Sequence, residues 1–203
     1  GLPFSVISPA SGARRPQIRF SRVDLPQPEG PTMATNSPSF TENDILNKVR
    51  WINDCENNKF LHYELPLDED KTRAWFHKNK DRADRYDAII EYDRNPVGVI
   101  GLLSIVDGRA EYYITLGESR YRGKGIARDA SILLLKYAFD ELDLLEVYLY
   151  TEVDNIPAQK LFEKCGFVKH RLDKNSAVNR GTLVDRFYYS ITASEFRENS
   201  KGK

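Results

Sequence analysis

The residues with the clearest capacity for chemistry form a basic, glycine-bearing turn at residues 120–127, with the sequence RYRGKGIA. Residues 111–116 before it are rich in β-forming side chains, and residues 130–139 after it have apolar residues at helical spacing. A helix N-terminus offers backbone N–H groups without intrahelical partners and the positive end of the helix dipole. Gly123 and Gly125 let an anion approach the backbone closely. The pattern predicts a phosphate-binding turn between a strand and a helix.

The spacing of the glycines separates this turn from the common nucleotide-binding motifs. A P-loop has the pattern G-x-x-x-x-G-K-[ST], which the chain lacks, so a nucleotide hydrolase has no support. A dinucleotide-binding turn has G-x-G-x-x-G, and here Arg128 stands in the position of the third glycine. The remaining pattern, R-x-x-G-x-G/A, by itself also fits an ordinary capped turn.

A second block, NIPAQKLFEKCGF at residues 155–167, changes this interpretation. Together the two blocks resemble the GNAT superfamily of acyl-CoA-dependent N-acetyltransferases, whose later signature is N-x-x-A-x-x-L-[FY]-x-K-x-G-F. The resemblance covers residues 41–196. It implies a mixed α/β (α+β) fold with a mostly antiparallel central sheet, helices on both faces and a splayed parallel strand pair. It also implies acetyl-CoA as the cosubstrate.

The resemblance assigns the turn to the pyrophosphate of acetyl-CoA and the strand before it to the pantetheine arm. Backbone groups of that strand are expected to face the arm, while the side chains of Ile114 and Leu116 enter the core. The arginines and lysine of the turn can add charge-assisted contacts to the CoA phosphates, and solvation of one or two of them is the alternative. Asn155 can lie near the pantetheine, cap a helix, or do both. The expected cosubstrate-binding residues are Ile114, Leu116, Arg120, Arg122, Gly123, Lys124, Gly125, Ile126, Ala127 and Asn155.

Direct acetyl transfer needs a neutral amine, a site for the developing oxyanion and a proton for the departing thiolate. Glu111 starts the strand that leads to the turn and is the expected base, acting through water; a solvated charge at the strand end is the alternative. Many relatives carry a tyrosine acid where this chain has Phe162, which has no proton to give. The acid is then Tyr188 or Tyr189 of the last strand, another tyrosine, or water.

Within the superfamily the chain resembles the branch of ribosomal-protein N-terminal, spermidine and nucleotide-linked amino-sugar acetyltransferases. Residues 110–111 (AE), 137–139 (YAF) and 184–186 (VDR) carry this similarity without separating the three acceptors. The expected function is acetyl transfer to a small-molecule or peptide primary amine. The alternative is an acyl-CoA-binding module without catalytic activity. The missing acid at Phe162 favours this alternative, and the expected base Glu111 argues against it.

Periodicity and turn residues place the remaining elements around these motifs. Helices are expected at residues 45–53, 66–79, from the glycine turn to about 141, and 156–164; strands are expected at 86–92, 97–106, 111–116 and 145–151. Residues 167–172 and 183–191 are expected to pair antiparallel across a polar loop at 173–181. The first strand of the family fits residues 34–40 poorly, because they are polar and contain Pro38.

Composition sets limits on partners and cofactors. The 203 residues, 40% of them hydrophobic, suffice for one sizeable core, and the 30 basic residues balance the 30 acidic ones. Binding to nucleic acid or to a membrane is therefore not expected. We expect a cytoplasmic protein, and a homodimer is a possible state. The spacings of Cys55, Cys165 and the histidines indicate neither a disulfide nor a metal site. A small core filler is favoured over a reactive thiol for Cys165.

The first 32 residues precede the sole methionine, Met33. They are rich in proline and show neither helical nor strand periodicity. We expect a disordered leader at residues 1–32, foreign to the native domain or upstream of it, and a single acetyltransferase domain at residues 33–203.

Overall fold

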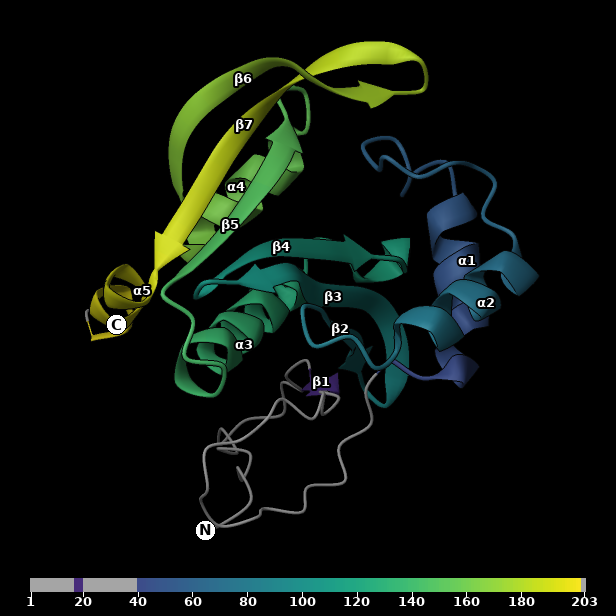
Figure 1. Cartoon of the computed structure of the whole chain (residues 1–203), viewed down its shortest axis with the longest axis horizontal. Coiled ribbons are helices and arrows are strands. Elements are labelled where there is room, and N and C mark those ends of the chain that lie inside the picture. Colours follow the sequence, from purple (N-terminus) through teal and green to yellow (C-terminus); the bar gives the residue numbers. More distant parts are fainter. Residues whose placement is uncertain (1–16, 20–39, 202–203) are drawn as a thin grey trace, which may run out of the picture.

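In a computed structural model of the chain, which describes residues 17–19 and 40–201, one sheet runs through the whole fold. Its seven strands lie in the order β1-β2-β3-β4-β5-β7-β6, and helices cover both faces (Figure 1). The strands are β1 (Gln17–Arg19), β2 (Tyr86–Tyr92), β3 (Asn95–Val106), β4 (Arg109–Leu116), β5 (Glu146–Glu152), β6 (Val168–Asn179) and β7 (Thr182–Thr192). β4 and β5 pair in parallel and the other neighbours antiparallel, which confirms the expected fold class.

The helices pack on the two faces of this sheet as two separate cores. The helices are α1 (Ile45–Asn53), α2 (Glu69–Asn79), α3 (Ile126–Asp140), α4 (Ile156–Cys165) and α5 (Ala193–Lys201), with 3-10 turns η1 (Glu42–Asp44) and η2 (Ser119–Tyr121). On one face, the α3 face, Leu134 of α3 and Phe162 of α4 join the larger core. On the other, the α1 face, Trp51 of α1 packs in a core that reaches β2, β3 and β4. In Figure 1, α1 and α2 stand beside this half of the sheet and away from β5, β6 and β7.

Local capping residues set where the helices begin. α2 begins at Glu69, three residues later than expected, because Asp68 is its N-cap and accepts a hydrogen bond from the N–H of Lys71 at 2.8 Å. α5 was not expected at all. Its signal is the capping box of Thr192 and Glu195, in which Glu195 accepts from the N–H of Thr192 at 2.8 Å and donates its own N–H to the Thr192 hydroxyl at 3.3 Å.

The prediction of a loop at residues 173–181 is wrong. β6 continues to Asn179, and the turn to β7 consists of Arg180 and Gly181. The pairing of β6 with β7 shifts register twice, between Lys169 and Arg171 and between Asp173 and Ala177. Such bulges interrupt the alternation of inward and outward side chains, so the sequence of β6 lacks the period of two that predicts a strand.

Part of the segment that we expected to lack structure also forms a strand. β1 pairs antiparallel with β2, with Gln17 opposite Glu91 and Arg19 opposite Ile89. The expectation of a leader without regular structure is therefore wrong for residues 17–19. The poor strand candidate at residues 34–39 lies outside the described residues.

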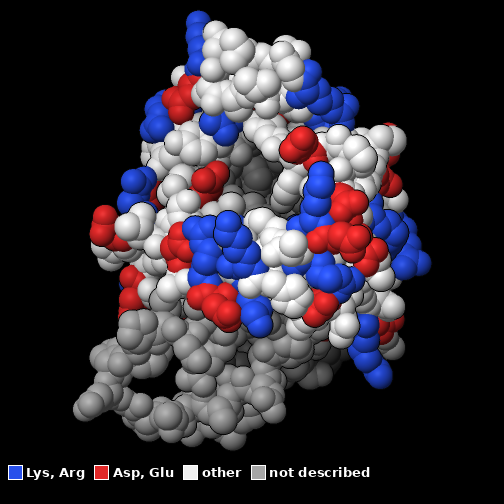
Figure 2. Space-filling model, turned by 45° about the vertical axis from the view of Figure 1, so that its right-hand side comes forward, with Lys and Arg blue, Asp and Glu red and all other residues white. Residues whose placement is uncertain are grey.

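The surface mixes charges of both signs. Figure 2 shows basic and acidic groups interspersed over one side of the molecule, with a hollow in the upper half whose walls are mostly uncharged. Among the helices in the described part of the chain, none has the length and apolar character to cross a membrane.

Candidate active site

The glycine turn joins η2 to the N-terminus of α3. Arg122 has an extended backbone, Gly123 has φ +74° and Gly125 has φ +79°, a left-handed conformation that side chains other than hydrogen disfavour. A Cβ built on Gly123 or Gly125 would meet no atom within 4 Å. Both glycines therefore border open space, and their backbone conformation favours a residue without a side chain.

Backbone donors line this open side of the turn. The first backbone hydrogen bond at the start of α3 runs from Asp129 to the carbonyl of Gly125 at 3.0 Å. The N–H groups of residues 123–128 have no acceptor among the described residues, so they and the positive end of the α3 dipole are available to an anion. These residues provide the backbone donors that a pyrophosphate needs.

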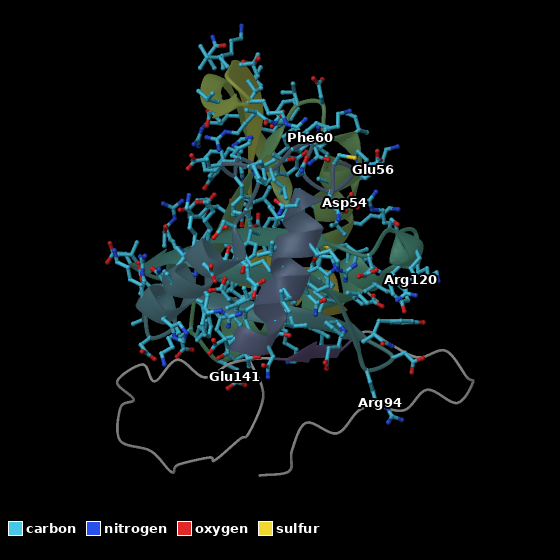
Figure 3. The ribbon with its side chains drawn as sticks, turned by 90° about the vertical axis from the view of Figure 1, so that its right-hand side faces the viewer. Asp54, Glu56, Phe60, Arg94, Arg120 and Glu141 are labelled. Atoms are coloured by element: carbon cyan, nitrogen blue, oxygen red, sulfur yellow. The ribbon has the colours of Figure 1, made fainter. Side chains whose placement is uncertain are left out.

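The three cationic side chains of the turn have different surroundings. Arg120 is exposed, 3.9 Å from Glu118 and 4.9 Å from the ring of Tyr121, and Figure 3 shows it at the outer edge of the molecule. Lys124 lies 5.2 Å from the same ring. Arg122 instead donates to the side chain of Asn57 and, at 3.4 Å, to the carbonyl of Glu56. Two of the three are thus exposed beside the Tyr121 ring, and the third is tied to the connection between α1 and α2.

Beyond the turn, β4 and β5 diverge. They pair from Arg109 opposite Glu146 to Glu111 opposite Tyr148, after which β4 continues to Leu116 and β5 to Glu152 without pairing to each other. We call this divergence the fork. Ile114 and Leu116 pack their side chains against the core of the α3 face, as expected, so these residues can offer only backbone groups to the fork.

Glu111 stands at the closed end of the fork, on the last paired row of β4. Its neighbours Ala110 and Tyr112 are buried in the core of the α3 face, so strand alternation points Glu111 to the α1 face. Its side chain makes no hydrogen bond or ion pair with any described residue. Partial burial raises the pKa of the Glu111 carboxyl, and the nearby charge of Arg186 opposes that rise. A carboxyl in such a setting suits a general base.

The two tyrosines considered as acids lie on opposite faces of β7. Tyr189 is completely buried in the core of the α3 face, and its hydroxyl donates to Glu163 at 3.1 Å. Tyr188 shares the α1 face with Glu111; its hydroxyl donates to Glu146 at 3.1 Å and accepts from Arg109 at 3.0 Å. Burial, together with the hydrogen bond to a carboxylate, raises the pKa of both hydroxyls. Of these two tyrosines, the structure therefore brings only Tyr188 to the face of the expected base.

Helix α4 borders the fork from the α3 face. Asn155 is its N-cap and accepts from the N–H of Ala158 at 3.4 Å, so the expected capping role is present. Phe162 packs its ring edge against Tyr112 at 5.9 Å and joins the core. Cys165 is buried and forms no disulfide, which agrees with a filler.

Sequence reasoning missed a loop that crosses from the glycine turn to the end of β5. Asn57 donates to the carbonyl of Gly117 at 2.8 Å, beside the end of β4. His62, later in the same loop, contacts the carboxylate of Glu152 at 2.8 Å. We call residues 54–62 the strap. Nothing in their polar sequence indicates a site, because the strap acquires its place only from partners far away in the chain.

The α1 face of β5 and β7 was also missed, although alternation in EVYLYTE at residues 146–152 is a readable signal for it. Tyr148, Tyr150 and Tyr188 cluster there, with Tyr188 5.9 Å from Tyr148 and 5.3 Å from Tyr150 between ring centroids. Arginines lie over these rings, Arg186 over Tyr150 at 4.6 Å and Arg171 over Tyr188 at 4.0 Å. Residues 17–19 and 40–201 contain no cluster of side chains able to hold a metal ion.

Comparisons with known proteins show which family the chain resembles in sequence. The acetyltransferase (GNAT) domain profile matches residues 38–168. A spermidine N(1)-acetyltransferase of Vibrio cholerae is 29% identical over 147 residues, covering 69% of this chain and 79% of the relative. A putative ribosomal N-acetyltransferase of Bacillus subtilis is 32% identical over 109 residues, covering 52% and 58%.

Comparison with solved structures shows the same fold in an acetyltransferase. The spermidine N-acetyltransferase of Vibrio cholerae in complex with CoA and spermine superposes with a TM-score of 0.73 at 24% identity. The match covers 79% of this chain and 96% of that structure.

Proposed function

This chain belongs to the acetyltransferase (GNAT) family, and we propose that it moves the acetyl group of acetyl-CoA directly to a primary amine held on the α1 face. The observation that carries the proposal is the alignment of three features along one strand. The anion-binding turn follows the end of β4, the fork opens beside β4, and Glu111 stands at the closed end of the fork. One strand thus links the phosphate end of a bound CoA to the group that takes a proton.

The turn binds by its backbone. We propose that the N–H groups of residues 123–128 hold the pyrophosphate, with Arg120 and Lys124 adding charge from the open side. Arg122 can join them only by exchanging its bonds to the strap. Unpaired backbone groups of Ile114 and Leu116 face the pantetheine arm, and Asn155 caps the helix at its other side.

Acetyl-CoA supplies an activated acetyl group, and the chain must supply a neutral amine. An alkyl ammonium has a pKa of about 10.4, so few acceptor molecules are nucleophilic at neutral pH. We propose that Glu111 takes this proton, directly or through one water, while the new C–N bond forms and the C–S bond breaks. Its raised pKa brings it closer to the working pH than an ordinary glutamate, which makes proton transfer more favourable.

For the proton that the thiolate receives, we propose Tyr188. It lies on the face of Glu111 and its hydroxyl is oriented by Arg109 and Glu146. Tyr189 is assigned a structural role, because its hydroxyl is buried against Glu163 on the other face. The demand on this acid is small, since a thiol has a pKa of about 8.5 and its thiolate can leave without a strong acid.

The acceptor is a small-molecule or peptide amine. One relative is named a spermidine N(1)-acetyltransferase and another a putative ribosomal N-acetyltransferase, so a polyamine and a protein N-terminus are the first candidates to test. The deciding experiment measures release of CoA thiol from acetyl-CoA with spermidine, a nucleotide-linked amino sugar and a ribosomal-type N-terminal peptide. Turnover with one of them supports the proposal, and binding of CoA without turnover of any amine contradicts it. The two cysteines form no disulfide, which fits a reducing compartment, and we propose that the protein is cytoplasmic.

A further inference from the structure

The charged groups on the α1 face of β5, β6 and β7 are almost all paired. Glu146 accepts from Arg109 at 2.7 Å, and Asp173 accepts from Arg171 at 2.9 Å. Glu152, at the far end of β5, is buried and binds His62 at 2.8 Å and the amide of Asn179 at 2.5 Å. These contacts neutralise or satisfy each of the three carboxylates within the protein.

Glu111 of β4 and Arg186 of β7 lie outside this pairing among the described residues. Arg186 forms no ion pair with any carboxylate among the described residues. Its guanidinium lies 4.6 Å from the centre of the Tyr150 ring and donates twice to Ser176, to the hydroxyl and to the carbonyl, each at 3.0 Å. Tyr150 and Ser176 therefore fix the direction of the guanidinium without neutralising its charge.

Strand register places Arg186 and Glu111 on one face. Tyr188 of β7 pairs with Tyr150 of β5, and Arg186 pairs with Glu152, so strand alternation sends both β7 side chains to the α1 face. The guanidinium reaches back along β5 to Tyr150, toward the row of Tyr148 and Glu111. Its charge acts on the Glu111 carboxyl without forming an ion pair with it. Among the described residues, the face thus presents the Glu111 carboxylate and the Arg186 guanidinium, separated and each without an ion pair.

We propose that the acceptor is zwitterionic: its primary amine meets Glu111, and an anionic group of the same molecule, a carboxylate or a phosphate, meets Arg186. This inference rests on the proposed function of the site. A guanidinium binds a carboxylate or phosphate by paired charge-assisted hydrogen bonds, and the orientation imposed by Ser176 leaves its remaining N–H groups for that anion. A polyamine would instead bring a second ammonium toward Arg186, where like charges repel.

Matched pairs of acceptors test this directly. L-Lysine is cadaverine with an added carboxylate, and glucosamine 6-phosphate is glucosamine with an added phosphate. We expect kcat/KM to be at least about tenfold higher for the anionic member of one pair, as for gain of one hydrogen bond between charged groups. The pair that shows the preference identifies the anion. Equal rates within both pairs, or a preference for cadaverine and spermidine, would overturn the proposal.

Variants then assign the preference to Arg186. Arg186→Gln should lower the ratio of kcat/KM between the anionic and the anion-free acceptor of a pair by about tenfold to a hundredfold. Arg171→Gln removes the same charge from the same face, but from a pair with Asp173, and should leave the ratio within each pair unchanged. Loss of the preference in Arg171→Gln but not in Arg186→Gln would contradict the assignment.

A binding measurement separates this inference from the proposed function. If no amine is acetylated, the proposed function fails. Thermal shifts of the CoA-bound protein with lysine against cadaverine, and with glucosamine 6-phosphate against glucosamine, still report acceptor binding. Greater stabilisation by the anionic member, lost in Arg186→Gln, supports the zwitterionic acceptor. Equal shifts contradict it. Arg186→Lys, which keeps the charge, should retain part of the preference if the glutamine variant is compromised in folding.

Discussion

The glycine turn and the α1 face are built in different ways. The turn consists of consecutive residues, and the groups that bind are backbone N–H groups. Their positions depend on the positive φ of Gly123 and Gly125 and not on the side chains of the neighbouring residues. The α1 face draws Glu111, Tyr148, and Arg186 from three different strands, and its working groups are side chains. A site made of backbone should depend on conformation, and a site made of side chains should depend on charge and hydroxyl groups.

The sharpest test of that difference is Gly123→Val. A β-branched residue at φ +74° is strained, and its side chain would fill the open space that an anion needs. We expect affinity for CoA to fall roughly a hundredfold or more, as for the loss of two hydrogen bonds to a charged group. Isothermal titration with CoA measures it.

Gly181→Val is the matched control. Gly181 has φ +79° and also borders open space, but it lies in the turn between β6 and β7. Both variants should lose a similar amount of stability, about 1–2 kcal/mol, from the same backbone strain. Only the variant at residue 123 should lose CoA binding. Equal affinities of the two variants for CoA would contradict the proposal that the turn binds the pyrophosphate.

Glu111→Gln tests the other region. We expect kcat to fall about a hundredfold while affinity for acetyl-CoA stays unchanged, because a base is lost and the turn is untouched. In the wild-type protein the acidic limb of the pH–kcat/KM profile should lie above the ordinary glutamate pKa, since burial raises the pKa of Glu111. In the variant that limb should disappear. Normal turnover in the variant would make Glu111 a bystander.

Stability gives the same substitution a second readout. A raised carboxyl pKa means that the folded state favours the neutral form, so the unfavourable charge develops as pH rises through the folded pKa. Glu111→Gln should therefore be at least as stable as the wild-type protein at neutral pH, and the difference should vanish in acid. A variant that loses turnover and stability together would indicate structural damage instead.

Replacing Tyr188 and Tyr189 in turn should have smaller effects on kcat, and these effects should differ between the two residues. Tyr188→Phe should lower kcat by about tenfold, less than a typical acid, because a thiolate leaves readily near neutral pH. Tyr189→Phe should leave kcat unchanged and lower the free energy of unfolding by about 1 kcal/mol, since it removes the partly buried hydrogen bond to Glu163. Steady-state kinetics and urea unfolding check both. The reverse pattern would move the acid to the α3 face.

The smallest effect concerns the segment before Met33. Its removal takes away β1, which pairs with the edge of β2 far from the fork. We expect turnover to be unchanged and stability to fall by about 1 kcal/mol, as for a few exposed strand hydrogen bonds. A large loss of turnover on truncation at Met33 would show that the leader belongs to the working domain.

The same contrast explains what the sequence could predict. The turn, the fork strands and the helix capped by Asn155 were predictable, because spacing and local propensity determine them. The strap was not, since Asn57 and His62 gain their roles from Gly117 and Glu152, distant in the chain. Strand alternation could identify which side chains share a face. It could not show that Arg171 finds a carboxylate while Arg186 does not.

The outer edge of the sheet has a consequence for how the molecule meets its own copies. β6 is a twelve-residue strand, and among the described residues nothing pairs with its free side. Long straight edges invite strand-to-strand aggregation, and bulges and charged side chains are the usual protection. β6 has two register shifts and carries Lys169, Arg171, Asp173 and Lys174 between and around them. A second copy approaching this edge therefore meets an interrupted row of backbone groups, which resists extension of the sheet into a fibre.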